Sequence, residues 1–175
     1  PNLLERNFIA QRPNQKWVTD VTEFKVAQEK VYLSPVMDLY NAEIVAYEVA
    51  SRPCLGLVTN MLGKAFKRLG NKPKLVLHSD QGWHYQHSQY RHKLAERGLN
   101  QSMSRKGNCL DNAAMESFFG TLKSEFFYLK RFESVEELKA GLDEYIHYYN
   151  HDRIKLKLNG MSPVKYRAHA AGAAS

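Results

Sequence analysis

The sequence is poor in cysteine and has no long hydrophobic run. Its 175 residues include two cysteines, Cys54 and Cys109, which do not form a C-x-x-C pair. A disulfide framework and a thiolate zinc site are therefore both disfavoured, and a reducing compartment is expected. No stretch approaches the roughly 18 uncharged apolar residues of a membrane-spanning helix. The first 12 residues lack the apolar centre of a secretory signal, and the missing initiator Met suggests a piece of a longer protein.

Several catalytic signatures are also missing. There is no G-x-x-x-x-G-K-[ST] phosphate loop, so ATP use is not indicated, and there is no Ser/His/Asp hydrolase pattern. His147 and His151 are four residues apart on a predicted helix. The glutamate of an H-E-x-x-H zinc site is absent between them, which disfavours a zinc centre there.

Positive charge is concentrated in the middle of the chain. Residues 52–106 carry 11 basic and 2 acidic side chains, residues 1–51 carry 5 and 7, and residues 107–175 carry 9 and 9. Such a field attracts a polyanion, and nucleic acid is the commonest one. A solubilising face opposite the core explains the same charge equally well, so composition leaves both interpretations open.

The residue pattern predicts a mixed α/β fold with helices packed on a sheet. The strand-like runs are Lys16–Val26, Lys30–Tyr40, Glu43–Ala50, Lys74–Asp80 and Gln101–Ser104. The helical runs are Cys54 to about Leu69, His87–Arg97, Asp111 or Asn112 to about Tyr128, and Ser134 to Tyr149. We expect a polar N-terminal segment over residues 1–12, a catalytic core with a C-terminal helical region over 13–167, and a disordered tail over 168–175.

Three acidic residues occupy positions that suit a site. Asp20 lies in the middle of a strand, where Asp is disfavoured, on the same face as Val18 and Phe24. Asp80 ends a short apolar strand and precedes a glycine turn, where ligands of α/β sheets commonly bind. Glu116 lies on the helix that begins near residue 111. Taken singly, each residue has an ordinary explanation. The Asp20 carboxylate could be hydrogen-bonded within its strand, Asp80 could simply begin a turn, and Glu116 could lie on a solvated helix face.

Taken together, the three acids point to metal chemistry. Carboxylate oxygens without His or Cys ligands suit hard cations such as Mg²⁺ or Mn²⁺. Two such ions can clamp the attacking and leaving oxygens of an in-line phosphoryl displacement. Lys123 lies two helical turns beyond Glu116, where it could hold a phosphate near the metals.

Longer stretches of the sequence resemble a known family. Asp20, Asp80 and, 35 intervening residues later, Glu116 resemble the D,D(35)E core of retroviral integrases and related transposases. Three motifs look like parts of the catalytic half of IS3-family insertion-sequence transposases. They are LHSDQGWHY, SRKGNCLDNAAMESFFGTLKSE and YNHDRIKLKLNGMSPVKYR. The resemblance extends from about Trp17 to Arg167. It implies an RNase H-like α/β fold, with a five-stranded mixed sheet flanked by helices, and Mg²⁺-dependent cutting and joining of DNA at element ends.

The resemblance also assigns roles to individual residues. It implies that Asp20, Asp80 and Glu116 are the catalytic residues and bind Mg²⁺ or Mn²⁺, as two ions. It matches Lys123 and Asn112 to family positions near the DNA. The predicted DNA contacts are Lys123, Asn112, Arg105, Lys106 and Arg153, of which Arg105 and Lys106 form a basic loop before the Glu116 helix. The role of the segment from Asn150 to Arg153, and those of His78 and His84, do not follow from the sequence.

The implied partners are DNA, as element ends and target, and further copies of the chain in a synaptic complex. An upstream helix-turn-helix and coiled-coil region, or a separate protein carrying one, is also implied. The implied location is the bacterial cytoplasm, associated with DNA and not with a membrane.

Two alternative functions remain open at this stage. The first is an RNase H-like nuclease that cuts without joining, because it needs the same three acids. The second is a non-catalytic DNA-binding module with a vestigial site, against which the presence of all three acids argues.

Overall fold

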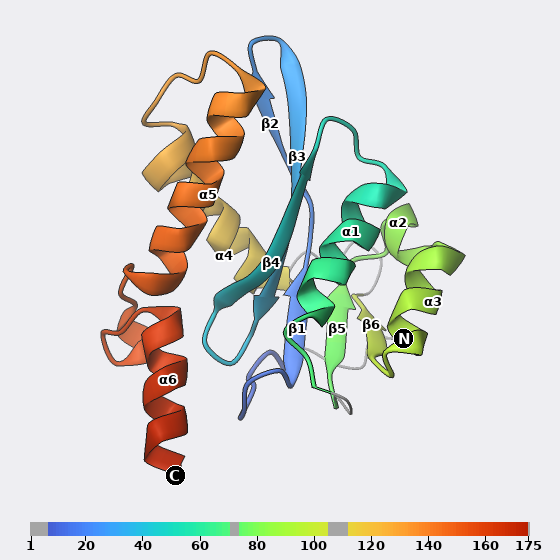
Figure 1. Ribbon diagram of the computed structural model, residues 1–175, viewed down its shortest axis with the longest axis vertical. Helices are drawn as coiled ribbons and strands as arrows, with labels where there is room; N and C mark the ends of the chain where they lie inside the picture. The colour runs from blue at the N-terminus through green and yellow to red at the C-terminus, as the bar shows by residue number, and fades with distance from the viewer. Residues whose placement is uncertain (1–6, 71–73, 105–111, 175) are drawn as a thin grey trace.

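A computed structural model describes residues 7–70, 74–104 and 112–174, and it shows one mixed sheet between two groups of helices (Figure 1). The strands are β1 (Lys16–Thr19), β2 (Thr22–Val26), β3 (Glu29–Asp38), β4 (Glu43–Ala50), β5 (Val76–Ser79) and β6 (Asn100–Met103). The helices are α1 (Leu55–Phe66), α2 (Trp83–Gln86), α3 (Ser88–Glu96), α4 (Ala113–Leu122), α5 (Val135–His151) and α6 (Pro163–Ala174). A π-helix, η2 (Lys123–Phe127), continues α4, and a 3₁₀ turn, η3 (Leu156–Leu158), follows α5.

The sheet is mixed, as the sequence predicts, but it has six strands instead of five. Strand β3 pairs antiparallel with β4 on one edge and with both β1 and β2 on the other, while β5 and β6 continue the sheet in parallel beyond β1. The extra strand arises because the run predicted as one strand, Lys16–Val26, is divided into β1 and β2.

Pro35 explains this division. The pairing register with β3 is the same on both sides of the break, since Thr19 faces Val36 and Thr22 faces Leu33. Continued through the gap, this register places Asp20 opposite Pro35. Proline has no N–H to donate to a ladder, so the strand pairing is interrupted there. The break releases Asp20 from a regular strand at the end of β1.

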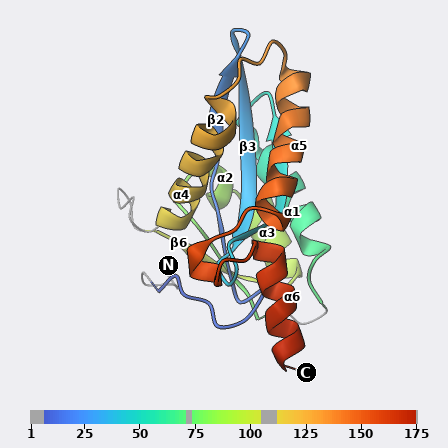
Figure 2. The same cartoon turned by 90° about the vertical axis from the view of Figure 1, so that its left-hand side faces the viewer.

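Two apolar cores lie on the two faces of the sheet. One face packs against α4 and α5, and its core includes Val18, Phe24 and Leu33 from the sheet. The other face packs against α1 and α3, around Trp17 and Leu77. Figure 2 shows α4 and α5 in front of the sheet, with α1 and α3 behind it. Val18 and Phe24 enter the same core, as the sequence predicts for one face of the first strand, and Trp17 enters the opposite core.

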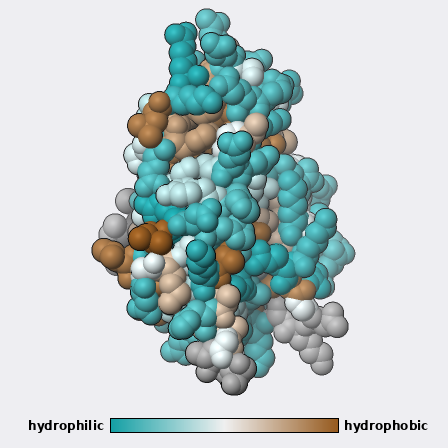
Figure 3. Space-filling view, turned by 60° about the vertical axis from the view of Figure 1, so that its left-hand side comes forward, coloured by the Kyte–Doolittle hydropathy of each residue, from teal (hydrophilic) through white to brown (hydrophobic). Residues whose placement is uncertain are grey.

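Two further features concern the C-terminal region and the surface. Of the tail predicted to be disordered over residues 168–175, residues 168–174 are part of helix α6, and Ser175 lies outside the described residues. Among the described residues, no helix combines the length and apolar character needed to cross a membrane. On the face drawn in Figure 3, hydrophilic side chains predominate and the hydrophobic patches are small and separate.

Candidate active site

Asp20 and Asp80 lie at the ends of two neighbouring parallel strands. Lys16, Trp17 and Val18 of β1 pair with Val76, Leu77 and His78 of β5. Extending this register by two residues places Asp20 directly beside Asp80. Adjacent strands lie about 4.8 Å apart, so the two carboxylates share one end of the sheet. Residues 60 positions apart in sequence are thus brought together by strand pairing alone.

A backbone N–H orients each of these carboxylates. Oδ1 of Asp20 accepts a hydrogen bond from the Val21 N–H at 2.8 Å, and Oδ1 of Asp80 accepts one from the Gly82 N–H at 2.7 Å. A Cβ at position 82 would lie 3.0 Å from Oδ1 of Asp80, so glycine permits this close turn. The second oxygen of each carboxylate can then face a cation.

Asn112 connects the strand that precedes Asp20 to the helix that carries Glu116. Asn112 is the N-cap residue of α4, is buried, and donates through Nδ2 to the Thr19 carbonyl at 3.2 Å. Glu116 is exposed in the first turn of α4. Asn112 was predicted to contact DNA. Its burial and its bond to β1 show that it joins the start of α4 to the strand that precedes Asp20, and the DNA contact stays a prediction.

The three acids influence one another electrostatically. Burial, together with the negative charges of Asp80 and Glu116, raises the pKa of Asp20 to about 6 against the lowering effect of the Val21 hydrogen bond. Within the described part of the chain, however, no group of three or more His, Cys, Asp and Glu side chains is arranged closely enough to hold a metal ion. The carboxylates are therefore near enough to repel one another but are not drawn into a coordination cluster. An all-oxygen donor set of this charge fits Mg²⁺ or Mn²⁺.

This raised pKa gives a prediction for stability without metal. Between pH 4 and 6, a larger fraction of the Asp20 carboxyl is protonated in the folded chain than in the unfolded chain. The free energy of unfolding therefore falls as pH rises through this window. We expect Asp20→Asn to increase the free energy of unfolding at pH 7 in EDTA by about 1–2 kcal/mol. Urea unfolding at pH 4.5 and pH 7 measures this, and a variant no more stable than wild type at pH 7 would refute the electrostatic strain.

Lys123 lies at the junction between α4 and the π-helix η2. Its Nζ is 5.5 Å from the centroid of the Phe24 ring on β2. The pKa of Glu23 is lowered mainly by the hydrogen bond from Tyr32, and the charge of Lys123 adds a small lowering. The Tyr128 N–H donates to the Lys123 carbonyl at 2.8 Å, which is the i to i+5 bond of a π turn. Single π turns inside helices are frequent at functional sites. Lys123 remains a predicted DNA contact.

Arg153 is engaged within the protein. Its Nε and Nη2 atoms donate to the two carboxylate oxygens of Glu125 at 2.8 and 2.6 Å. The Tyr145 hydroxyl donates to the same carboxylate at 2.8 Å. The pair joins the π-helix to the end of α5 and leaves fewer donors for a phosphate. This geometry favours a positioning role for Arg153 over the predicted DNA contact. Arg105 and Lys106 lie outside the described residues.

Exchanging the two charges tests the role of Arg153. For the DNA joining that the sequence resemblance implies, we expect Arg153→Ala to reduce the rate by roughly 10- to 100-fold, because Glu125 loses its ion pair and the helix carrying Glu116 loses its anchor. The double variant Glu125→Arg/Arg153→Glu should recover most of this loss. If Arg153 instead contacts DNA, the exchange will leave the loss uncorrected, and the salt dependence of DNA binding will weaken.

The C-terminal motif, residues 149–167, makes contacts that stabilise the fold. The Asn150 side chain donates to the Ile44 carbonyl at 3.0 Å and accepts from the Ile44 N–H at 2.9 Å, so it pairs with the edge strand β4 as a neighbouring strand would. The Tyr149 hydroxyl donates to the Ala42 carbonyl at 2.7 Å. Arg167 reaches Glu43 at 3.1 Å from α6. These contacts attach α5 and α6 to the β3–β4 hairpin.

Sequence reasoning missed Tyr85 at this site. Tyr85 is 2% exposed on α2, and the charges of Asp20 and Asp80 act on its hydroxyl, whose pKa burial holds well above the ordinary value. It therefore forms part of the floor under the two aspartates. The one sequence feature that pointed to Tyr85 was its position in the motif LHSDQGWHY, five residues after Asp80. His78 is also buried below the site, with Nδ1 2.8 Å from Ser102 Oγ.

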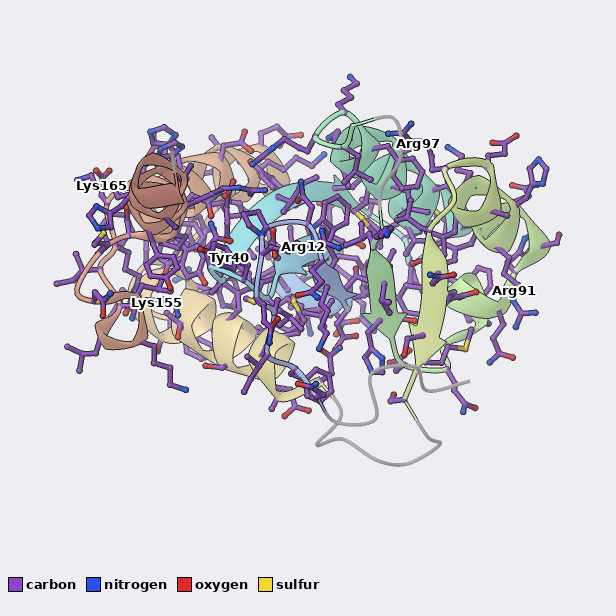
Figure 4. The ribbon with its side chains drawn as sticks, turned by 90° about the horizontal axis from the view of Figure 1, so that it is seen from below. Arg12, Tyr40, Arg91, Arg97, Lys155 and Lys165 are labelled. Carbon is purple, nitrogen blue, oxygen red and sulfur yellow. The ribbon has the colours of Figure 1, made fainter. Side chains whose placement is uncertain are left out.

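Several of the described basic residues in the middle of the chain are engaged within the protein. Lys64 forms an ion pair with Glu48 at 3.4 Å, and Arg68 forms one with Glu43 at 2.9 Å. Both therefore neutralise acidic residues in the first third of the chain. Arg97 donates to the Phe66, Leu69 and Gly70 carbonyls at the end of α1. Figure 4 shows Arg91 and Arg97 on the α1–α3 side of the molecule, with Lys155 and Lys165 on the opposite side. Part of the positive charge thus stabilises the fold instead of facing a ligand.

Comparison with known proteins identifies the family. Residues 10–109 and 116–170 match two families, each described as "Integrase core domain". The chain belongs to the integrase core family. The proposed site lies in the matched regions, since both aspartates fall in the first and Glu116 opens the second.

The curated proteins that the chain resembles include bacterial transposases. The chain is 58% identical over 95% of its length to a putative transposase for insertion sequence element IS150 of Escherichia coli, of which it spans 59%. It is also 58% identical over 97% of its length to a transposase-like protein of Haemophilus influenzae, of which it spans 78%. The transposase for insertion sequence IS3A is 35% identical over 94% of this chain and 58% of that protein. The chain spans about three fifths of the first of these relatives. The resemblance to IS3-type transposases is confirmed.

Solved integrase structures share the fold. The HTLV-2 integrase catalytic core domain in complex with magnesium superposes with a TM-score of 0.74 at 15% identity, over 90% of this chain and 99% of that one. A chain of the simian T-cell lymphotropic virus intasome superposes with a TM-score of 0.73 at 19% identity, over 83% of this chain and 51% of that one. These similarities confirm the predicted RNase H-like fold class.

Proposed function

We propose that this chain is the catalytic domain of a DNA transposase that cuts and joins DNA at the ends of an insertion element. The observation that carries the proposal is the pairing of β1 with β5, which brings Asp20 beside Asp80 at one end of the sheet. The charge of Glu116 acts on the same place. The close transposase relatives support the choice of DNA as substrate.

The three carboxylates are the proposed metal ligands and catalytic residues. Asp20 and Asp80 would share one ion, and Glu116 would complete the site of a second. Bound Mg²⁺ or Mn²⁺ would activate a water or hydroxyl and stabilise the charge that develops on the phosphate oxygens. The magnesium in the related integrase core structure supports this choice of metal.

The proposed reaction has two displacements at phosphorus. In the first, water attacks the phosphodiester at an element end, the bond to the 3′ oxygen breaks, and a 3′-OH is released. In the second, that hydroxyl attacks another phosphodiester and displaces its 3′ oxygen, so the element end is joined to new DNA. The family resemblance suggests that the first joining links the two element ends and that integration elsewhere follows. No covalent intermediate with the protein forms, and no ATP is consumed.

The other residues would bind and orient the DNA. Lys123, Arg105 and Lys106 are the proposed phosphate contacts, while Asn112 holds α4 in place and Arg153 anchors the π-helix. Since transposition brings two DNA ends together, we propose that copies of the chain assemble on DNA and act in the bacterial cytoplasm. An upstream end-binding region, or a separate protein carrying one, would supply sequence recognition.

A labelled donor-end oligonucleotide tests the function. We expect the chain to produce both shortened and joined strands in Mg²⁺ or Mn²⁺, and neither in EDTA, as resolved on a denaturing gel. Shortened strands without joined ones would support the nuclease alternative. Neither product in either metal, with DNA binding intact, would support a non-catalytic DNA-binding module and overturn the proposal.

A further inference from the structure

Trp83 is an exposed aromatic residue next to the proposed site. Its side chain is 55% exposed, although tryptophan is among the residues that bury the most apolar surface. Trp83 begins α2, three residues after Asp80. Three residues of chain span at most roughly 10 Å, so the indole lies close to the carboxylates. Neither the proposed metal site nor either core uses this ring.

The turn that carries Trp83 is tightly held. The Gly82 N–H is bonded to Asp80, and the Gln86 side chain donates to the Gln81 carbonyl. Gln101 donates to the Tyr85 carbonyl at 2.7 Å from the neighbouring strand β6. Tyr85 anchors α2 from below. The exposure of Trp83 is therefore a property of a fixed turn and not of a loose loop.

His84 supports the indole from one side. The Trp83 and His84 rings are stacked with their centroids 4.1 Å apart and their planes at 27°. Nε2 of His84 donates to the Pro53 carbonyl at 2.9 Å, which fixes the imidazole to the loop before α1. One face of the indole is thus covered by a ring that cannot readily move, and more than half of the side chain remains open to solvent.

This arrangement suits a flat ligand that stacks on the indole. Bases stack on exposed aromatic side chains, and removing the aromatic ring weakens binding of single-stranded nucleic acid. Arg52 directly precedes Pro53 and is exposed, which adds positive charge for the backbone of such a strand. A base inside a duplex has both faces occupied by its neighbours, so an unpaired base is better able to stack on the indole.

We propose that Trp83, supported by His84, is a stacking platform for an unpaired DNA base close to the phosphodiester that reacts. The inference rests on the proposed function for the identity of the nucleic acid. The platform would hold the strand beside Asp80 and favour substrates whose bases are unpaired at the cleavage position. Trp83 is a binding residue in this account and takes no part in the chemical step.

Fluorescence of the two tryptophans provides a direct test. Trp17 is fully buried, so a change in emission on adding DNA reports on Trp83. Two probes are compared in EDTA at one salt concentration: a duplex with a single-stranded adenine overhang, and the same duplex with an abasic overhang of equal length. Both carry the same phosphates. We expect the adenine overhang to quench the emission strongly and the abasic overhang to quench it little.

Binding of the same probes to variants gives the magnitude. We expect wild type to prefer the adenine overhang by roughly 5- to 100-fold in Kd, and Trp83→Ala to reduce this ratio to near 1. Trp83→Phe should retain an intermediate ratio. Tyr128→Ala removes another exposed aromatic, 71% exposed at the end of η2, and should leave the ratio unchanged. Far-UV circular dichroism confirms that each variant is folded.

The opposing result is equally clear. Equal quenching by both overhangs, or an unchanged ratio in Trp83→Ala, would overturn the platform, including the case in which Trp83 serves a protein partner. Because the measurements use no catalytic metal, they can succeed for a chain that does not cleave DNA. Cleavage without any base-dependent ratio would refute the platform and leave the proposed function intact.

Discussion

Asp80→Asn and Glu116→Gln are expected to lower Mg²⁺-dependent cleavage and joining by at least about 10³-fold, because each removes a charged ligand of the proposed ions. Asn and Gln keep the shape of the side chains, and both positions are solvent-exposed. The fold should therefore be unaffected. Single-turnover assays with the labelled donor end measure the loss.

DNA binding separates a catalytic role from a structural one. Removing one negative charge next to a polyanion should leave the Kd for donor DNA unchanged or slightly lower, as measured by fluorescence anisotropy in EDTA. Glu144→Gln is the matched control, since Glu144 is exposed on α5 in the C-terminal half of that helix. It should retain full activity. Joined product from either site variant at more than a tenth of the wild-type rate would remove that residue from the catalytic set.

Glu43→Ala is expected to reduce the free energy of unfolding by about 3 kcal/mol, at the lower end of the range for breaking a buried ion pair. Glu43 is 3% exposed and receives hydrogen bonds from Arg68 at 2.9 Å, Arg167 at 3.1 Å and Asn41 at 3.1 Å. The two guanidinium groups are partly exposed and can regain water, which limits the loss.

The loss should depend on pH and on the shape of the replacement. Burial raises the pKa of Glu43, but hydrogen bonds from Asn41 and the arginines outweigh it, so the pKa lies below its ordinary value. A lowered carboxyl pKa stabilises the fold above the unfolded pKa, and this contribution disappears as pH falls through the folded pKa. Urea unfolding at pH 7 should give a smaller loss for Glu43→Gln, and Glu144→Ala should change stability by no more than about 0.5 kcal/mol. Equal stability of Glu43→Ala and wild type would contradict the network.

The buried carboxylates Glu43 and Asp20 have opposite effects on the stability of the fold. The network around Glu43 joins the β3–β4 hairpin to α1 and α6, and every charge in it has a partner. At the candidate site, by contrast, Asp20 is held with a raised pKa beside two further carboxylates. Groups held in an unfavourable state by the surrounding fold are typical of functional sites. The Asp20→Asn and Glu43→Ala variants should therefore change stability in opposite directions.

Much of the architecture follows from local pattern. Alternation in the first strand places Trp17 and Val18 in opposite cores, and the helix predicted to begin at Ser134 is capped by that residue, with the Glu137 N–H donating to Ser134 Oγ at 3.1 Å. Helix periods and glycine stops lie within the chain segment they describe, so sequence alone can reveal them. The division of the first strand was not predicted because its cause, Pro35, lies on the partner strand.

The sequence by itself determined the α/β fold class, the three acidic positions and the relationship to IS3-type transposases. Motifs and the spacing between them can be read directly along the chain. Only the tertiary structure decided which side chains meet. Strand pairing sets Asp20 beside Asp80, burial commits Asn112 to β1, and Glu125 occupies the guanidinium of Arg153. A charged residue at a family position looks the same in sequence whether its partner is DNA or another side chain of the protein. Its partner is chosen by contacts between distant segments, and these exist only once the chain has folded.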